Sequence, residues 1–244
     1  MIILLGSSSG IGKKLLGQLS KIDEILALYN YNKPDINISN VYLEKIDITK
    51  IEQINHRHCE TKSRAKIIQN IISNKKDEIH IIDVGGESTR PGSIPVSVEG
   101  EGRRLLPVLE LICPRVKIPV SVDTHKAEVA RQAIEVGATM INDIWGLKAD
   151  PKIAEVAAEK KVPLVVMHCQ KTTEYSDLLP DILMSLQKSV NMALDAGVLQ
   201  ENIIIDPGIG FGKTADHNLE ILRRLAEFRT LNRPLLVGMS RKST

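Results

Sequence analysis

The sequence predicts a parallel α/β barrel, and three observations lead to this fold class. First, short apolar runs alternate with segments in which apolar residues recur at helical spacing. Second, the apolar runs are almost continuous, which is typical of parallel strands that are covered by helices. Third, polar residues follow each of six successive runs. The carboxyl ends of all strands share one face of a β/α barrel, whereas a doubly wound sheet gathers such residues near one switch point, so their even spread favours the barrel.

Six strands and five helices are expected from residue 79 onward. The expected strands cover 79–84, 117–122, 138–142, 162–167, 202–206 and 234–238. The expected helices cover 98–112, 126–136, 151–160, 178–197 and 215–230. Upstream, residues 41–48 predict a seventh strand, which is followed by a helix at about 61–74. Seven units fall short of the usual eight, and the chain stops at Thr244, so the barrel is expected to be incomplete at its carboxyl terminus.

The polar residues at these strand ends are the first candidates for a functional site. They are Asp83, Glu87, Asp123, Asn142, Asp143, His168, Asp206, Ser240, Arg241 and Lys242. A single strand-end aspartate is more often a helix cap, and Asp123 is placed to cap the helix expected at 126–136. Several such residues around one barrel mouth favour a binding site instead.

The loop after the first of the six strands is rich in hydrogen-bonding groups. Residues 80–94 read IHIIDVGGESTRPGS, in which Gly85 and Gly86 permit a sharp exit from the strand and Pro91 stiffens the loop. An arginine at position 90 is suited to hold phosphate oxygens while negative charge develops on a leaving group. The alternative is an ordinary surface loop with a solvated arginine.

A different signal opens the chain. Residues 1–19 read MIILLGSSSGIGKKLLGQL, which predicts a strand, a glycine-rich turn and the start of a helix. The spacing of Gly6, Gly10 and Gly12 allows backbone N–H groups to approach a phosphate at a helix amino terminus. The plainer interpretation, a βα unit with a tight turn, is favoured. A further hypothesis places the strand at residues 1–5 in the vacant position of the barrel.

Composition excludes several classes of protein. The chain has 244 residues, of which 43% are hydrophobic and 3% aromatic, so the core must be aliphatic. A net charge of +2 gives no electrostatic argument for nucleic acid binding. No apolar run approaches the roughly 20 residues that span a bilayer, and no signal peptide is evident. Three scattered cysteines make no disulfide framework. We therefore expect a soluble cytoplasmic protein without a membrane or nucleic acid partner.

Five motifs, in order, resemble those of dihydropteroate synthases. They read IIDVGGESTRPGS, IPVSVDTHKAEVARQAIEVGATMINDI, VVMHCQ, IIIDPGIGFGKTADHNLEIL and GMSRKS. The resemblance covers about residues 62–244. It implies a TIM-type barrel of the pterin-binding family and a transferase of folate biosynthesis. Such enzymes condense 6-hydroxymethyl-7,8-dihydropterin diphosphate with 4-aminobenzoate and release pyrophosphate.

The resemblance also implies a set of site residues. Asp206 matches the bidentate pterin anchor, Asp123 and Asn142 match further pterin contacts, and Lys242 matches the lysine that reaches the pterin carbonyl and the aminobenzoate pocket. This agrees with the chemistry of a pterin edge, since one carboxylate can accept from its amino group and its ring N–H together. The substrate-binding set is Thr89, Arg90, Pro91, Asp123, Asn142, Met167, Asp206, Lys242 and Ser243, and the catalytic set is Lys242, Asp206 and Arg90. A packing role is expected for the adjacent Met167 and His168.

The sequence departs from the family pattern in three places. KIDITKI stands where the family has an NVTPDSF-type motif, whose asparagine binds magnesium. The chain stops before the strand with the family's Arg-x-His anion site, and MHCQK replaces MHMxG. Mg²⁺ is thus implied by the family, although its usual protein ligand is absent, and no metal or cofactor site is assigned. A homodimer is possible, but the usual dimer helices are largely missing. The alternative to the transferase is a catalytically impaired pterin-binding barrel fragment or fusion.

Roughly the first 50 residues resemble the opening of short-chain dehydrogenases/reductases, with Asp47 at the later acidic strand end. The family's tyrosine–lysine pair is not matched, because Tyr29 and Lys33 have the spacing but lie too early in the chain. We expect a Rossmann-like βαβ segment at 1–55 and the barrel at 56–244. A corrinoid-linked methyltransferase and a nicotinamide-dependent reductase are further alternatives. The GGESTRPG and SRKS motifs argue against the methyltransferase, since both suit an aminobenzoate pocket.

Overall fold

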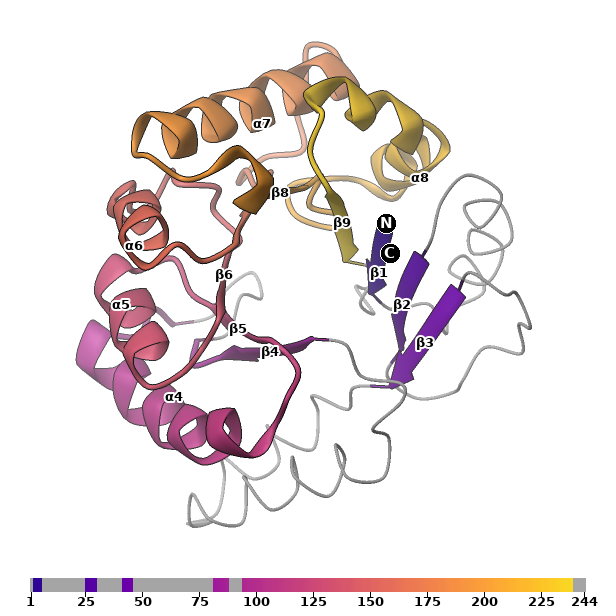
Figure 1. Cartoon of the computed structure of the whole chain (residues 1–244). Helices are drawn as coiled ribbons and strands as arrows, with labels where there is room; N and C mark the ends of the chain where they lie inside the picture. Colours follow the sequence, from indigo (N-terminus) through magenta and orange to yellow (C-terminus); the bar gives the residue numbers. More distant parts are fainter. Residues whose placement is uncertain (1, 6–24, 30–40, 46–80, 88–93, 239–244) are drawn as a thin grey trace.

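A computed structural model describes residues 2–5, 25–29 and 41–45 as backbone strands, and residues 81–87 and 94–238 in full. Within these ranges nine strands form one sheet, all neighbours being parallel, in the order β3-β2-β1-β9-β8-β7-β6-β5-β4. The strands are β1 (Ile2–Leu5), β2 (Ile25–Tyr29), β3 (Val41–Lys45), β4 (Ile82–Gly85), β5 (Val120–Asp123), β6 (Met140–Asp143), β7 (Leu164–Met167), β8 (Ile203–Asp206) and β9 (Leu235–Gly238). The sheet curls into an open barrel, as Figure 1 shows.

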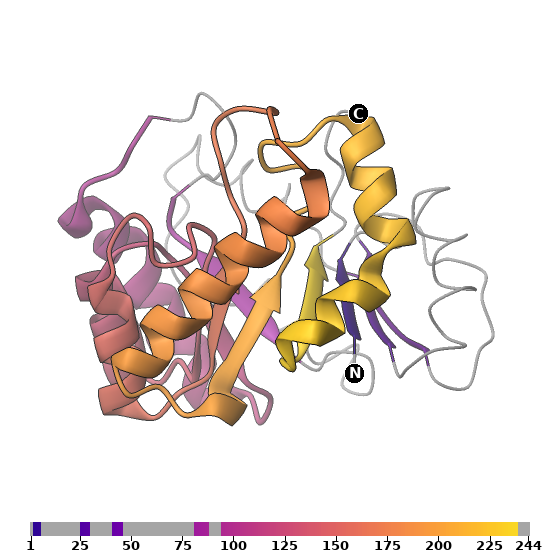
Figure 2. The same cartoon turned by 90° about the horizontal axis from the view of Figure 1, so that it is seen from above.

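Five α-helices follow β4 to β8 in turn. They are α4 (Val98–Ile112), α5 (Ala127–Glu135), α6 (Lys152–Lys160), α7 (Leu178–Asp195) and α8 (Ala215–Arg223). Short 3₁₀ segments are η1 (Cys113–Arg115), η2 (Gln200–Asn202) and η3 (Leu225–Leu231). The helices lie around the outside of the strands, and a second view shows α7 and α8 across one side of them (Figures 1 and 2). None of the helices in the described ranges has both the length and the apolar composition needed to cross a membrane.

The expected strands and helices from residue 79 onward are confirmed within a few residues, with one difference. The helix expected at 215–230 ends at Arg223, and the chain continues as η3. Arg224 leaves helical geometry with φ −110° and ψ 21°, which tightens the following turns. The strand expected at 41–48 is confirmed as β3, while the helix expected at 61–74 lies outside the described residues.

The amino-terminal strand takes up the position that the sequence hypothesis gave it. β1 pairs with β9 over four residues, from Ile2 opposite Leu235 to Leu5 opposite Gly238. β2 and β3 then extend the same sheet, so its two edges are β3 and β4. Among the described strands the barrel is therefore incomplete, as expected, with β3 and β4 as its edges, whereas β9 is paired on both sides.

The core between the sheet and its helices is aliphatic, as the composition predicted. Outward-facing strand residues pack against buried helix residues; the strand set includes Val120, Val122, Ile141, Leu164, Val166, Ile203 and Ile205. Each buried Leu, Ile or Val contributes roughly 1.5–3 kcal/mol relative to an exposed one. In the described ranges one phenylalanine, Phe228 of η3, is among the fully buried side chains. This core fixes the strands, and hence the side chains at their carboxyl ends.

Candidate functional site

Strand register brings four of the expected site residues to one wall. Asp123 lies opposite Asn142 in the β5–β6 pair, and Met167 lies opposite Asp206 in the β7–β8 pair. Asn142 is in turn paired with Val165, two residues before Met167 and on the same face. The residues that alternate with these, such as Val122, Ile141, Val166 and Ile205, belong to the helix-facing core. All four side chains therefore share the inner face of the sheet at its carboxyl edge.

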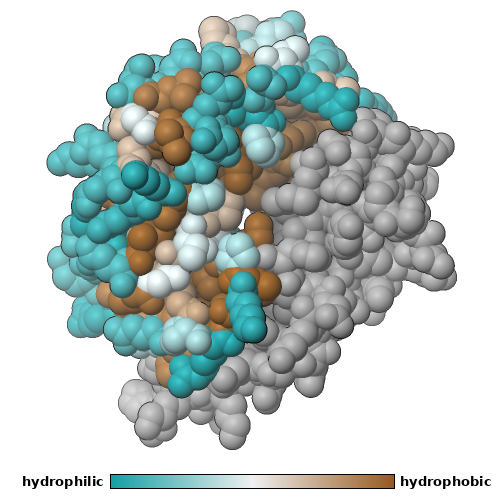
Figure 3. Space-filling model, viewed as in Figure 1, coloured by the Kyte–Doolittle hydropathy of each residue, from teal (hydrophilic) through white to brown (hydrophobic). Residues whose placement is uncertain are grey.

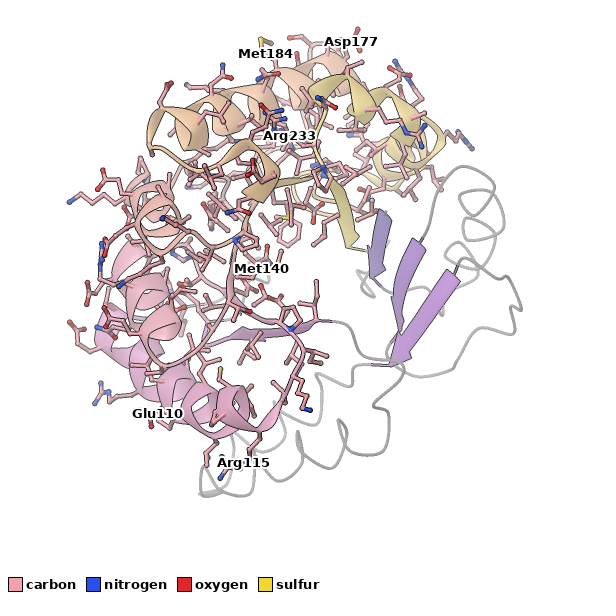
Figure 4. The ribbon with its side chains drawn as sticks, in the orientation of Figure 1. Glu110, Arg115, Met140, Asp177, Met184 and Arg233 are labelled. Carbon is pink, nitrogen blue, oxygen red and sulfur yellow. The ribbon has the colours of Figure 1, made fainter. Side chains whose placement is uncertain are left out.

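The figures agree with this division into an inner and an outer side. Met140, which shares its face with Asn142, lies toward the middle of the ring in Figure 4, whereas Glu110 and Arg115 lie on the outer rim. In Figure 3 hydrophilic residues dominate the rim, and hydrophobic surface lies toward the middle. The strands run away from the viewer in this orientation (Figure 2), so the view shows the amino-terminal end of the barrel, where Met140 marks its inner side.

Asp83, one of the strand-end candidates, also joins this wall, although the set of site residues implied by the resemblance does not include it. Asn142 Nδ2 donates to Asp83 Oδ2 at 3.1 Å, across the intervening strand β5. Burial raises the pKa of Asp83, against hydrogen bonds from Ser121 and Asn142 that lower it. Burial likewise raises the pKa of Asp123 well above its usual range, and the nearby Asp83 carboxylate raises it further. Two inward carboxyl groups therefore lie close together on this wall, so a donor-rich ligand would find acceptors there.

Asp123 is part of this wall and not the cap of the following helix. The first amide of α5, Ala127 N–H, donates to Asp150 Oδ2 at 2.8 Å. The preceding amide, Lys126 N–H, donates to Thr124 Oγ1 at 3.3 Å. Because Asp150 serves the helix terminus, the alternative of a capping role for Asp123 is wrong.

Asp206 is 5% exposed, and its carboxylate is oriented by the turn that follows β8. Gly208 N–H donates to Asp206 Oδ1 at 2.7 Å, and Gly208 has a φ of +69°. A Cβ atom on Gly208 would lie 1.9 Å from the carbonyl oxygen of His168, so only glycine fits this turn. The sequence DPG thus combines a carboxylate with the backbone that fixes it.

His168 and Lys213 join the loops after β7 and β8. Lys213 is 8% exposed and its Nζ lies 2.9 Å from His168 Nδ1 and 3.0 Å from the carbonyl oxygen of Phe211. Burial, together with the charges of Lys213 and Lys148, lowers the pKa of His168 to about 3, so the imidazole is neutral and Nδ1 accepts from the ammonium. The packing role expected for His168 is thus replaced by a polar one. Lys213 was missed, and its only signal was a charge at the end of the run GIGFGK.

Met167 has the packing role expected of it. It lies in a small apolar cluster with Ile144 and Cys169, against Trp145 and Phe211. The cluster forms an apolar wall beside Asp206, its partner across the strands. A flat heterocycle can pack against such a surface while its edge meets the carboxylate.

Asp143 shows how the strand-end signal can mislead. Its side chain points away from the inner face, where Oδ1 accepts from Trp145 N–H at 2.9 Å and Oδ2 from Leu147 N–H at 2.6 Å. Burial raises its pKa to about 6, although these backbone hydrogen bonds oppose the rise. Asp143 therefore shapes the turn after β6, in which Leu147 has a φ of +66°.

The other expected site residues lie outside the described residues. These are Thr89, Arg90 and Pro91 of the loop after β4, and Lys242 and Ser243 after β9, together with Ser240 and Arg241. The same is true of Gly6, Gly10, Gly12, Lys33 and Asp47. Their roles stay predictions. Among the residues that are described, no group of three or more His, Cys, Asp or Glu side chains is arranged to hold a metal ion.

The fold and this wall define an α/β-barrel protein with polar side chains gathered at the carboxyl ends of its strands. Residues 55–244 match the family of pterin binding enzymes, so the chain belongs to that family. The expected resemblance is confirmed at this level, over the range in which the motifs occur. The match does not extend to residues 1–54.

Several relatives and solved structures that this chain resembles are named dihydropteroate synthase. Dihydropteroate synthase of Bacillus subtilis is 53% identical over 166 residues, which are 68% of this chain and 58% of the relative. The enzyme of Escherichia coli is 46% identical over 170 residues, 67% of this chain and 60% of the relative. The chain thus spans about three fifths of the length of these two curated relatives.

Two crystal structures show the same architecture. Dihydropteroate synthase of Xanthomonas albilineans with 4-aminobenzoic acid has a TM-score of 0.70 at 35% identity and covers 77% of this chain and 68% of that one. The Yersinia pestis enzyme with a pterin–sulfa conjugate has a TM-score of 0.69 at 38% identity and covers 75% and 69%. The expected barrel fold is therefore confirmed.

Proposed function

We propose that this protein is a dihydropteroate synthase-type transferase of folate biosynthesis. It would condense 6-hydroxymethyl-7,8-dihydropterin diphosphate with 4-aminobenzoate and release pyrophosphate. One observation carries the proposal: Asp123, Asn142 and Asp206 share the inner wall of a barrel that belongs to the pterin-binding family. The names of the relatives support the same reaction.

The wall suits the edge of a pterin. The heterocycle presents an amino group and a ring N–H as donors, beside a carbonyl acceptor. The Asp206 carboxylate, held by the Gly208 amide, is placed to accept from both donors, and the amide of Asn142 can both donate and accept. The Met167 cluster supplies an apolar surface for the ring. Asp123, beside Asn142, adds a second acceptor.

The remaining groups complete the proposal by resemblance. Thr89, Arg90 and Pro91 would contact 4-aminobenzoate and the diphosphate, and Lys242 with Ser243 would reach the pterin carbonyl and the aminobenzoate pocket. In the reaction the methylene C–O bond breaks toward pyrophosphate, and a C–N bond forms with the aromatic amine, which then releases a proton. Such a substitution needs little acid–base work from the protein. Arg90 and Lys242 would stabilise the separating charges, and Asp206 would orient the electrophile.

Magnesium is the cofactor that the family resemblance implies. The described residues offer no cluster of ligands for it, and KIDITKI replaces the motif with the usual asparagine. We therefore derive no step of the reaction through the metal.

The second candidate function is a pterin-binding barrel without transferase activity. It is favoured by the same replacement of the NVTPDSF-type motif. Losing one group that stabilises charge commonly costs about two to three powers of ten in rate. Binding of a pterin with no condensation would distinguish this candidate from the first.

Three further expectations belong to the proposal. The chain would divide into a Rossmann-like segment at 1–55 and the barrel at 56–244, act in the cytoplasm and assemble, if at all, as a homodimer. The matches reported above give no support to the resemblance of residues 1–50 to short-chain dehydrogenases/reductases, which stays a prediction.

The first test is calorimetric titration of the chain with a dihydropterin diphosphate, with and without Mg²⁺. Wild-type binding that Asp206→Asn weakens at least about 100-fold is expected, since the anchor loses its charge. Asp177→Asn, at the exposed start of α7, is the matched control and should bind as the wild type does. A turnover assay with 4-aminobenzoate then separates the two candidate functions. Absence of heat at any concentration would refute both.

A further inference from the structure

A lysine joins two carboxylates behind the loop that follows β4. Lys126 lies directly before α5. Its Nζ is 2.5 Å from Glu101 Oε2 of α4 and contacts Glu87 Oε2, two residues after β4. Glu101 is fully buried, and its Oε1 atom has no hydrogen-bond partner within the described part of the chain. One ammonium therefore links the carboxyl end of a strand with two helices.

Glu87 in turn closes the base of the loop. Val96 N–H donates to Glu87 Oε1 at 3.2 Å. The residue directly before the segment 88–95 is therefore hydrogen-bonded to the residue directly after it. The entry is fixed further, because Arg104 Nη1 donates to the carbonyl oxygen of Gly86 at 3.2 Å. Gly86 is also packed tightly, since a Cβ atom on it would lie 2.8 Å from Glu101 Cγ.

The charges of Glu87 and Lys126 persist across the neutral range. Burial alone would raise the pKa of Glu87, but hydrogen bonds from Lys126 and Val96 outweigh it and hold the pKa below the usual value. Burial would lower the pKa of Lys126, but its hydrogen bonds to Glu101 and Glu87 raise it above the usual value. The lysine thus remains an ammonium between carboxylates that bind it strongly.

We propose that Lys126 is a positioning residue for the second substrate. By holding Glu87, Lys126 fixes both ends of the segment 88–95. It also lies three residues after Asp123, which belongs to the wall described above. The inference rests on the proposed function, in which Thr89 and Arg90 contact 4-aminobenzoate and the diphosphate. Lys126 touches neither substrate in this proposal; it sets the loop relative to the wall.

The test separates the loop from the fold. Lys126→Met alone would leave Glu101 buried without a counter-charge, so it is combined with Glu101→Leu, which removes both charges together. Lys126→Arg is the conservative variant. The matched control is Arg131→Met within α5, which removes an exposed ion pair, 2.6 Å long, with Glu159. Glu87→Ala serves as the reference for a loop whose base is open.

Two measurements are made on each variant. Hydrogen exchange of the Val96 amide reports the loop base, and exchange of Val122 in β5 reports the fold. Calorimetry gives the affinity for a dihydropterin and, with pterin and pyrophosphate present, the affinity for 4-aminobenzoate. The double variant should speed Val96 exchange and weaken 4-aminobenzoate at least about tenfold, while Val122 exchange and pterin affinity stay within about twofold. Lys126→Arg should keep Val96 exchange and 4-aminobenzoate affinity near the wild-type values, and Arg131→Met should change neither quantity.

Two results overturn the proposal: Val96 exchange in the double variant at the wild-type rate, or faster exchange with unchanged 4-aminobenzoate affinity. A wild-type chain that binds no pterin would instead refute the proposed function. The exchange data would still decide whether Lys126 holds the loop, so the two failures are distinguishable.

Discussion

Lys213 places an ammonium beside the His168 ring in a site that excludes water. Burial first, and then the charges of Lys213 and Lys148, favour the neutral imidazole, which is why the pKa of His168 falls from 6.5 to about 3 on folding. The unfolded chain binds this proton below about pH 6.5 and the folded chain does not, so protons favour unfolding. The stability contributed by this pair is present above pH 6.5 and is lost progressively as the pH falls toward 3.

His168→Gln tests this at the residue scale. The wild type should lose about 3 kcal/mol of unfolding free energy from this group between pH 6.5 and pH 4, and the variant should not. Asp143 acts in the opposite direction, because a carboxyl whose pKa is raised to about 6 stabilises the fold below its usual pKa and loses that contribution as the pH rises through 6. The difference between wild type and His168→Gln, from urea unfolding at each pH, cancels the Asp143 effect. Parallel pH profiles for the two proteins would contradict the assignment.

Several single residues of the site follow from the sequence, and others do not. Asp123, Asn142, Met167 and Asp206 could be predicted, because each ends a recognisable strand and parallel strand ends meet on one face. Asp143 ends a strand equally well, but alternation turns it to the other side, and a one-residue difference in phase cannot be read from an apolar run. Lys213 lies in a loop, where its partner His168 is set by tertiary contact alone.

At the scale of elements, the turns after β7 and β8 fix one another. His168 N–H donates to the carbonyl oxygen of Asp206 at 2.8 Å, and Tyr175 Oη donates to the carbonyl oxygen of Gly212 at 2.8 Å. Gly208 and Gly212 adopt positive φ where the two loops approach. The position of Asp206 therefore depends on the packing of two loops as well as on β8.

Gly208→Ala should disturb this packing strongly. The added Cβ meets the His168 carbonyl oxygen at 1.9 Å and its positive φ strains any side chain, so we expect a loss of at least about 3 kcal/mol in unfolding free energy. Gly197→Ala is the control, because Gly197 also has a positive φ, of +92°, but a Cβ there lies 3.7 Å from the nearest atom. That control should lose about 1 kcal/mol. Equal losses in the two variants, by urea unfolding, would show that the loop contact contributes nothing.

At the scale of the whole molecule, the sequence predicts the alternation of strands and helices well because each βα unit carries its own periodicity. Strand order across the sheet cannot be predicted in the same way, because local periodicity does not determine which strand pairs with β9. The structure places β1 there, with β2 and β3 continuing the sheet to its edge. The strand β2 is the feature that a closed barrel would not need, whereas a barrel with two edges can hold it.

The contact between β1 and β9 leads to a prediction for the molecule as a whole. Without residues 1–50, β9 becomes an edge strand, and its unpaired N–H and C=O groups invite association with other chains. We expect the shortened chain to have a melting temperature lower by several degrees and to associate, as measured by light scattering. Ile3→Pro removes one backbone N–H donor from β1, so it should lower the melting temperature less. Gly12→Pro, in the glycine-rich segment that follows β1 in the sequence, is the control. It separates the loss of β1 pairing from a general effect of introducing proline. A shortened chain that stays monomeric and melts with the full chain would mean that the barrel is stable on residues 51–244 alone, and that β1 contributes no stability through β9.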